Sequence, residues 1–257
     1  MGLNNQWMQR DLAVLWHPCT QMKDHQQLPL VPIKRGEGVW LEDFEGKRYL
    51  DAVSSWWVNV FGHANPRINQ LIKDQVDQLE HVILAGFSHQ PVIELSERLV
   101  AMTPEGLTRC FYADNGSSCI EVALKMSIHY RLNRGQPNKK RFVTLTNSYH
   151  GETIAAMSVG DVPLFTETYK ALLLDTIKVP SPDCYLRPEG MSWEEHSRTM
   201  FAAMEQTLAE HHHEVAAVIV EPLIQGAGGM RMYHPIYLTL LREACDRYGV
   251  HLIHDEI

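Results

Sequence analysis

Residues 215–220 read VAAVIV, six apolar side chains in a row, and Glu221 follows them. A strand with one face in water alternates apolar and polar residues, so an unbroken apolar run of this length is typical of a strand buried on both faces. Three more short apolar runs occur at 109–113 (RCFYA), 142–146 (FVTLT) and 250–254 (VHLIH). We therefore predict four strands in a sheet that is covered on both sides.

Segments with helical spacing separate some of these runs, at about 117–133, 199–212 and 236–248. Strands that are joined by helices form a mostly parallel sheet, so the predicted fold class is α/β. The stretch from Gly160 to Trp193 is rich in Pro and Asp, and we expect it to run over the surface as a long loop.

The N-terminal part has a different pattern. Residues 39–52 (VWLEDFEGKRYLDA) alternate apolar and polar side chains on both sides of a glycine-containing turn, which predicts a β-hairpin. Apolar positions at helical spacing predict two amphipathic helices, at 68–83 and 92–102. We place a boundary between an N-terminal β-containing segment, residues 1–65, and a large domain, residues 66–257.

The composition of the chain disfavours several classes of binding partner. The 257 residues are 45% hydrophobic, and the net charge of −8 is spread without a block of Lys or Arg, which disfavours nucleic acid and anionic membranes. The sequence has no apolar run of roughly 18 residues and does not begin like a secretion signal, so we expect a cytoplasmic location. Five irregularly spaced cysteines fit neither a disulfide framework nor a zinc ribbon. A small-molecule ligand is expected.

The first predicted strand is followed by a possible anion site. Asn115 and Gly116 make a turn, Ser117 and Ser118 open a helix, and Ser118 with Glu121 fits a capping box. Helix N-terminal amides and serine hydroxyls suit a phosphate group, although an ordinary capped helix has the same pattern. Neither a GxGxxG nor a GxxxxGK[ST] motif is present, so a dinucleotide and a P-loop nucleotide are disfavoured.

The other three strands also end in residues that can do chemistry. Tyr149 and His150 follow the second run, and an aromatic ring at that place can stack on a flat ligand. Glu221 follows the third run and Asp255 the fourth. Because an unpaired buried carboxylate is costly, Asp255 needs a cationic or donor partner, and the protonated ring nitrogen of pyridoxal phosphate is one.

A metal site is the alternative for the last strand. His251 and His254 lie close to Asp255 and Glu256. The two histidines point to opposite faces of a strand, however, so they do not easily share one ion. We predict no metal.

The order of these motifs resembles the class III aminotransferases. The most specific pieces are WHPCT (16–20), SSWWVNVFGHANP (54–66), ADNGSSCIEVALKM (113–126), NSYHGET (147–153) and EPLIQGAGGMRMYHP (221–235), and the resemblance spans nearly the whole chain. It implies a fold type I transferase, pyridoxal 5'-phosphate as cofactor, and a homodimer.

The resemblance also implies roles for single residues. Gly116 and Ser117 would hold the cofactor phosphate, and Tyr149 would lie over the pyridine ring and touch substrate. Glu221 would support the phenolic side of the cofactor, and Asp255 would pair with the ring nitrogen.

Within the family, the resemblance is to the branch that acts in biotin synthesis. Trp56 and Trp57 would line the substrate pocket, and Ala227 stands where glutamate-using relatives tend to have Glu. This branch implies S-adenosylmethionine as amino donor and 8-amino-7-oxononanoate as acceptor, giving 7,8-diaminononanoate. Another class III enzyme, acting on a diamine or an ω-amino acid, and a non-catalytic binder of a phosphate ligand are the alternatives.

Two departures from the family pattern stand out. Cys19 occupies the position where relatives usually have a tyrosine that contacts substrate, so its catalytic role is doubtful. The Schiff-base lysine of the family follows the D-E-I motif, and none of the lysines in this sequence matches it. We expect the C-terminal part of the fold to be missing and the chain as written to be inactive.

Overall fold

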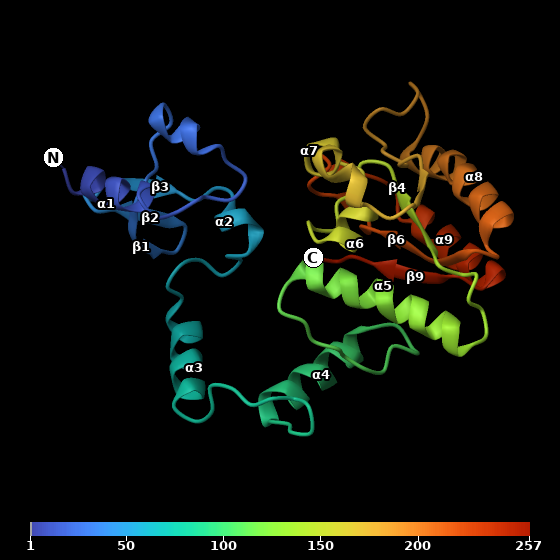
Figure 1. Ribbon diagram of the computed structural model, residues 1–257, viewed down its shortest axis with the longest axis horizontal. Coiled ribbons are helices and arrows are strands. Elements are labelled where there is room, and N and C mark those ends of the chain that lie inside the picture. The colour runs from blue at the N-terminus through green and yellow to red at the C-terminus, as the bar shows by residue number, and fades with distance from the viewer. Residues whose placement is uncertain (1) are drawn as a thin grey trace. The chain divides into compact units, whose positions relative to one another are not determined.

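The computed structural model describes residues 2–257, which divide into two compact units between Thr108 and Arg109. Figure 1 shows the helices and strands of both. The division falls later in the chain than residue 65, where the hairpin pattern led us to place it. That residues 1–65 contribute to a small domain and to the substrate pocket stays a prediction.

The N-terminal unit is built around a three-stranded antiparallel sheet in the order β1-β2-β3. The predicted hairpin and the helix predicted at 92–102 are confirmed. The helix predicted at 68–83 is present but ends at Val76, and β1 is a strand that the sequence analysis did not identify. The elements are α1 (Leu3–Leu12), η1 (Met22–Gln26), β1 (Ile33–Glu37), β2 (Trp40–Asp43), β3 (Arg48–Leu50), α2 (Ser54–Trp57), α3 (Pro66–Val76) and α4 (Gln90–Met102).

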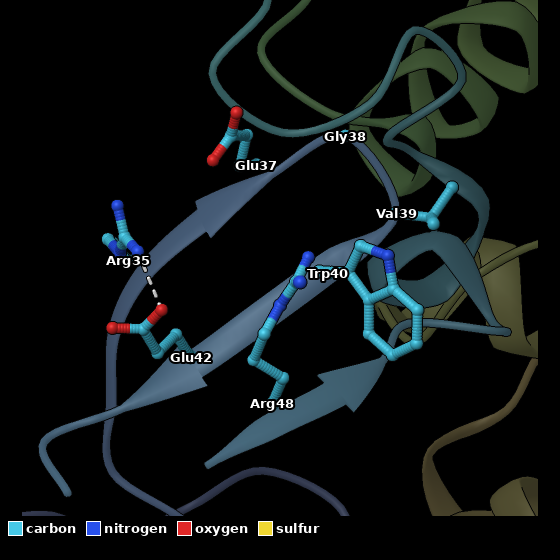
Figure 2. A pocket seen from close by; sticks show the side chains of 7 residues that line it. All are labelled: Arg35, Glu37, Gly38, Val39, Trp40, Glu42 and Arg48. Carbon is cyan, nitrogen blue, oxygen red and sulfur yellow. Dashed lines mark hydrogen bonds and ion pairs between the residues drawn. The ribbon is translucent and has the colours of Figure 1, made fainter. Parts of the chain in front are cut away.

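One face of this sheet carries charged side chains. Figure 2 shows the ion pair between Arg35 and Glu42, whose nitrogen and oxygen are 2.7 Å apart, and Arg48 beside Trp40. The guanidinium carbon of Arg48 lies 4.7 Å from the indole centroid. Exposed ion pairs of this kind contribute little to the free energy of unfolding, so this pair is not what stabilises the sheet.

The C-terminal unit contains a four-stranded, fully parallel sheet in the order β5-β4-β6-β9. The predicted α/β class and three of the four predicted strands are confirmed. The elements are α5 (Gly116–Asn133), β4 (Arg141–Leu145), α6 (Ile154–Ser158), α7 (Pro163–Thr166), η2 (Glu167–Leu172), β5 (Ile177–Val179), α8 (Trp193–His211), β6 (Val215–Val220), β7 (Ile224–Gln225), β8 (Arg231–Met232), α9 (Ile236–Tyr248) and β9 (His251–His254).

Strand β6 is buried on both faces, as its unbroken apolar run predicts. All six of its residues are fully buried. Val218 and Val220 belong to a core that includes side chains of α8 and α9, whereas Ala217 and Ile219 belong to a second core with α5 and α6. Figure 1 shows α5 and the pair α8 and α9 on opposite sides of the sheet. Because its four strands are parallel, their carboxyl ends lie along one edge of the sheet.

Two local predictions were wrong. Residues 109–113 form no strand, and Phe111 is 66% exposed. An apolar run becomes a strand only when its backbone pairs with a neighbour, and within residues 2–257 the sheet ends at β5 on one side and β9 on the other. The stretch from Gly160 to Trp193 is more than a surface loop, because it contributes β5 to the sheet and buries Val179 and Cys184 completely.

No helix within residues 2–257 combines the length and the apolar character needed to cross a membrane.

Candidate cofactor site

The sheet changes direction between β4 and β6. From β4 the chain crosses to β5 on one side, and from β6 it continues to β9 on the other. At such a switch point the loops leave in opposite directions and open a crevice at the carboxyl ends of the strands, where α/β proteins bind ligands. Tyr149, Glu221 and Asp255 all follow carboxyl ends at this edge, as the sequence predicts.

Glu221 bridges the switch point. Its Oε1 accepts a hydrogen bond from the Tyr149 amide at 2.9 Å, and its Oε2 accepts one from the Gly226 amide at 2.8 Å. The carboxylate therefore joins the loop after β4 to the glycine loop after β6. Burial raises the pKa of Glu221 above its ordinary value, and these two amide donors oppose the rise.

Asp255 is paired with a histidine that the sequence analysis did not assign to it. Asp255 Oδ2 lies 2.8 Å from His150 Nδ1, and the two side chains are 8% and 0% exposed. The Asp255 amide donates to the Val220 carbonyl at 2.9 Å and so continues the β6–β9 ladder. Its Oδ1 accepts only a long bond, 3.4 Å, from the Ile257 amide. A buried carboxylate is thus held in place with one oxygen still able to accept a strong hydrogen bond.

His150 carries a second notable atom. Its Nε2 is buried and has no hydrogen-bond partner among residues 2–257. Its Nδ1 faces Asp255 Oδ2, so this nitrogen holds the carboxylate while Nε2 stays open. The aspartate and the histidine are 105 positions apart, so no local pattern in the sequence reveals the pair.

Helix α5 begins differently from the capping-box prediction, which was wrong. Asn115 is the N-cap, and its side chain accepts a hydrogen bond from the Ser118 amide at 2.9 Å. Because the helix starts at Gly116, Ser118 is its third residue and not its cap. Glu121 instead accepts hydrogen bonds from the amides of Ala155, at 2.8 Å, and Ala156, at 3.3 Å, at the start of α6.

The loop after β4 lies against the first turn of α5. Ser117 Oγ accepts a hydrogen bond from the Glu152 amide at 3.2 Å. Gly151 has φ +117°, and a Cβ added there would lie 3.0 Å from Ser117 Cα and closer still to its Oγ. A Cβ on Gly116 would collide with Ile257 Cδ1. The start of α5, the loop after β4 and the segment after β9 therefore meet. At Gly151 the positive φ and the nearby Ser117 backbone both favour glycine, whereas at Gly116 the nearby atom is the tip of the exposed Ile257 side chain.

The first amides of α5 remain available for a ligand. Among the described residues, none accepts a hydrogen bond from the amides of Gly116 or Ser117. These amides stand at the positive end of an 18-residue helix. The start of α5 is therefore a suitable place for an anion, as the sequence predicts.

Tyr149 is half-buried beside this edge. Its ring packs on Phe165 with centroids 4.9 Å apart and planes tilted by 58°, and its hydroxyl donates to Glu152 Oε1 at 3.0 Å. Glu152 belongs to the loop after β4, and Phe165 belongs to α7. Two successive parts of the chain therefore contact the Tyr149 ring.

The residues at this edge fit pyridoxal 5'-phosphate. The cofactor has a phosphate dianion that helix amides and a serine hydroxyl can bind, and a pyridine nitrogen that a buried carboxylate keeps protonated. Asp255 supplies that carboxylate, and among residues 2–257 its Oδ1 accepts only the 3.4 Å bond from the Ile257 amide.

A metal centre finds less support. Residues 2–257 contain no group of three or more His, Cys, Asp or Glu side chains placed to hold an ion. His251 instead contacts Ser127 Oγ at 3.2 Å through its Nδ1 and packs edge-on against Tyr130.

Three of the predicted site residues lie in the N-terminal unit. Trp56 and Trp57 are 62% and 53% exposed, and Cys19 is exposed with φ +56°. Their roles toward the site of the C-terminal unit stay predictions.

Comparison with known proteins agrees with the fold and with the chemistry of this edge. The family model described as "Aminotransferase class-III" matches residues 20–257. The chain belongs to the class III aminotransferase family. Class III aminotransferases depend on pyridoxal phosphate.

Two curated relatives of this class III chain carry the same name. The adenosylmethionine-8-amino-7-oxononanoate aminotransferase of Helicobacter pylori is 47% identical over 248 residues, which are 96% of this chain and 54% of the relative. The enzyme of the same name from Geobacter sulfurreducens is 42% identical over 96% of this chain and 55% of its own. The chain thus spans about half the length of the curated relatives it matches.

Solved structures of class III enzymes have the same fold. The adenosylmethionine-8-amino-7-oxononanoate aminotransferase of Methanocaldococcus jannaschii gives a TM-score of 0.89 at 36% identity, over 98% of this chain and 55% of that one. An omega transaminase of Pseudomonas jessenii, in complex with PMP, gives 0.88 at 30% identity, over 99% and 56%.

Proposed function

We propose that the edge formed by α5, β4, β6 and β9 binds pyridoxal 5'-phosphate, and that the whole protein is an aminotransferase of biotin synthesis. It transfers the amino group of S-adenosylmethionine to 8-amino-7-oxononanoate and forms 7,8-diaminononanoate. The observation that carries the cofactor proposal is the buried Asp255–His150 pair, which stands at a strand end close to the open amides of α5. The names of the relatives from H. pylori and G. sulfurreducens support the reaction.

Each residue of the edge has a definite task in this proposal. Gly116 and Ser117 bind the phosphate through their amides and the Ser117 hydroxyl. Tyr149 lies over the pyridine ring and contacts substrate. Asp255 accepts a hydrogen bond from the ring nitrogen and holds the proton there, since a charge-assisted bond is about twice as strong as a neutral one. When bound, the charged ring draws electron density away from the substrate carbon that loses its proton.

His150 and Glu221 support this arrangement. His150 Nδ1 lies 2.8 Å from Asp255 Oδ2 and would hold this carboxylate in the orientation that the ring nitrogen needs. Glu221 joins the Tyr149 loop to the glycine loop through two amide hydrogen bonds. It would support the phenolic side of the cofactor.

In this proposal, residues of the N-terminal unit contact the substrate. Trp56 and Trp57 form an apolar wall for the aliphatic chain of the acceptor. Cys19 stands in place of the family's tyrosine, and because a thiol has no ring and a weaker donor, we expect slower transfer. A homodimer, small-molecule substrates only, and a cytoplasmic location complete the proposal.

Transfer also requires the lysine that holds the cofactor in this family. None of the lysines in residues 1–257 occupies the place after Asp255 where the family has it. We therefore propose that the 257-residue polypeptide alone does not turn over. Borohydride reduction in the presence of pyridoxal 5'-phosphate tests this, because a stable adduct on one lysine together with transaminase activity would overturn it.

The reaction itself is tested with the whole gene product in which residues 1–257 occur. We expect 7,8-diaminononanoate to form with S-adenosylmethionine as donor, and little or none with glutamate or alanine. The likeness to the P. jessenii omega transaminase favours a second candidate, an ω-amino acid or diamine aminotransferase. Faster transfer from an ω-amino acid than from S-adenosylmethionine would support that candidate and contradict ours.

A further inference from the structure

The segment Ser54–Trp57 has an unusual backbone. Its four residues have φ values of +50°, +49°, +67° and +70°, and none is glycine. Left-handed backbone is unfavourable for residues with a Cβ, and several in succession persist only where surrounding contacts hold them. We call this segment the left-handed turn.

A small hydrogen-bond network holds the turn at its start. Asp51 Oδ1 accepts from the Ser55 amide at 2.9 Å, and Asp51 Oδ2 accepts from the Ser55 hydroxyl at 2.7 Å. His63 Nε2 lies 2.8 Å from the same Oδ2, and His63 Nδ1 lies 2.6 Å from Asn59 Nδ2. A neutral His63 that accepts from Asn59 and donates to Asp51 satisfies every bond in this chain. The Asp51 and His63 side chains are only 9% and 19% exposed.

The network is fixed to the sheet of the N-terminal unit. The Asp51 amide donates to the Val39 carbonyl at 2.9 Å, and His63 and Gly38 exchange two backbone hydrogen bonds of 2.8 and 3.0 Å. Figure 2 shows Gly38 and Val39 at the turn between β1 and β2. A Cβ on Gly36 would lie 2.7 Å from His63 Cβ and Cγ, so the imidazole packs directly on the strand. The sheet is therefore the base from which the left-handed turn is held.

What the turn presents is apolar surface. Trp56 and Trp57 are more than half exposed, and Val58 and Phe61 just beyond them are 80% and 74% exposed. Large apolar side chains grouped on a surface generally mark a binding site. A strained backbone beneath them fits the same interpretation, because strain tends to be kept where function needs a particular geometry.

We propose that Asp51 and His63 are positioning residues that hold the left-handed turn, so that Trp56 and Trp57 stand as a fixed apolar wall that selects the amino acceptor. The inference rests on the proposed function, which places these tryptophans in the acceptor pocket. It predicts that loosening the network weakens recognition of the acceptor and leaves the chemical step unchanged.

The test uses Asp51→Asn in the whole gene product labelled with 5-fluorotryptophan. The new amide places an NH₂ donor against the His63 donor and breaks the network while keeping the side-chain shape. We expect the ¹⁹F signals of Trp56 and Trp57 to shift and broaden, and KM for the acceptor to rise about tenfold with kcat unchanged, in the range that apolar pocket contacts supply.

A second substitution serves as rescue. Ser55→Gly in the Asp51→Asn background should move both the ¹⁹F signals and KM back toward their original values, because glycine adopts the left-handed conformation without penalty. A generally damaged fold would not respond to this change. Asp74→Asn, at an exposed position of α3, is the matched control and should alter neither readout.

Each outcome separates the inference from the proposed function. Unchanged ¹⁹F signals in Asp51→Asn overturn the positioning role. If the signals move while KM for the acceptor stays constant, selection by the turn is overturned, and Trp56→Ala locates the error. A raised KM in Trp56→Ala then leaves the proposed function standing, whereas an unchanged KM shows that the tryptophans are not in the acceptor pocket.

Discussion

Gly151→Ala is the substitution to which the cofactor site should be most sensitive. Gly151 joins the loop after β4 to the first turn of α5, where the phosphate is proposed to bind. Its φ of +117° disfavours any residue with a Cβ, and the added atom would lie 3.0 Å from Ser117 Cα, 2.9 Å from Ser117 Cβ and closer still to Oγ. Either the loop or the start of α5 has to move.

The expected cost has two parts. Forcing a non-glycine residue into this backbone conformation costs about 1–3 kcal/mol. Overpacking against Ser117 costs about 1–3 kcal/mol more. Gly190→Ala isolates the first part, because Gly190 has φ +80° and a Cβ there would have nothing within 4 Å. The two variants should therefore differ by about 1–3 kcal/mol in free energy of unfolding.

Urea unfolding and titration with pyridoxamine 5'-phosphate measure the two effects. We expect Gly151→Ala to lose about tenfold or more in affinity for this ligand, since 1.4 kcal/mol corresponds to a factor of ten. Gly190→Ala should bind as the unmodified protein does. Equal stability of the two variants, or undiminished affinity in Gly151→Ala, would show that the loop and α5 do not meet as argued.

Substitutions at three further positions test other parts of the site. His150→Leu leaves the buried Asp255 carboxylate without its donor and should lower the free energy of unfolding by about 2–5 kcal/mol; His150→Asn, whose amide still donates, should lower it less in the same urea titration. Because burial raises the folded-state pKa of Glu221 above its ordinary 4.5, the free energy of unfolding should fall as pH rises from that value through the raised pKa. Glu221→Gln should remove this fall, and an unchanged pH dependence would contradict the assignment. Cys19→Tyr should speed amino transfer by the whole gene product about tenfold or more if the thiol stands at the substrate-contacting position, and steady-state kinetics would show it.

The strands of this sheet could be predicted because a segment buried on both faces is apolar along its whole length. VAAVIV at 215–220 has no polar side chain, and such a run is suited to the centre of a covered parallel sheet. The run at 109–113 was also predicted to be a strand but forms none, because a strand requires a paired neighbour, which composition does not report. Strand β5 was not predicted, because its three residues at 177–179 are too few to show a pattern.

The site was predictable only in part. The chemistry-bearing residues follow strand ends, so Tyr149, Glu221 and Asp255 could be placed at one edge from the sequence. Their partners could not, because the His150–Asp255 contact joins positions far apart in the chain and depends on the strand order. The capping-box prediction was wrong because the proposed cap, Ser118, lies inside the first turn of α5. In the structure Asn115 caps this helix.

The central claim is that this edge of the sheet binds a pyridoxal cofactor, and a crystal structure of the whole gene product with pyridoxamine 5'-phosphate tests it most directly. This ligand has no aldehyde, so the protein's noncovalent contacts alone must hold it. We predict the phosphate on the amides of Gly116 and Ser117, and an Asp255 oxygen at about 2.7–2.9 Å from the pyridine nitrogen. A phosphate bound elsewhere, or a pyridine nitrogen beyond hydrogen-bond reach of Asp255, would contradict the account.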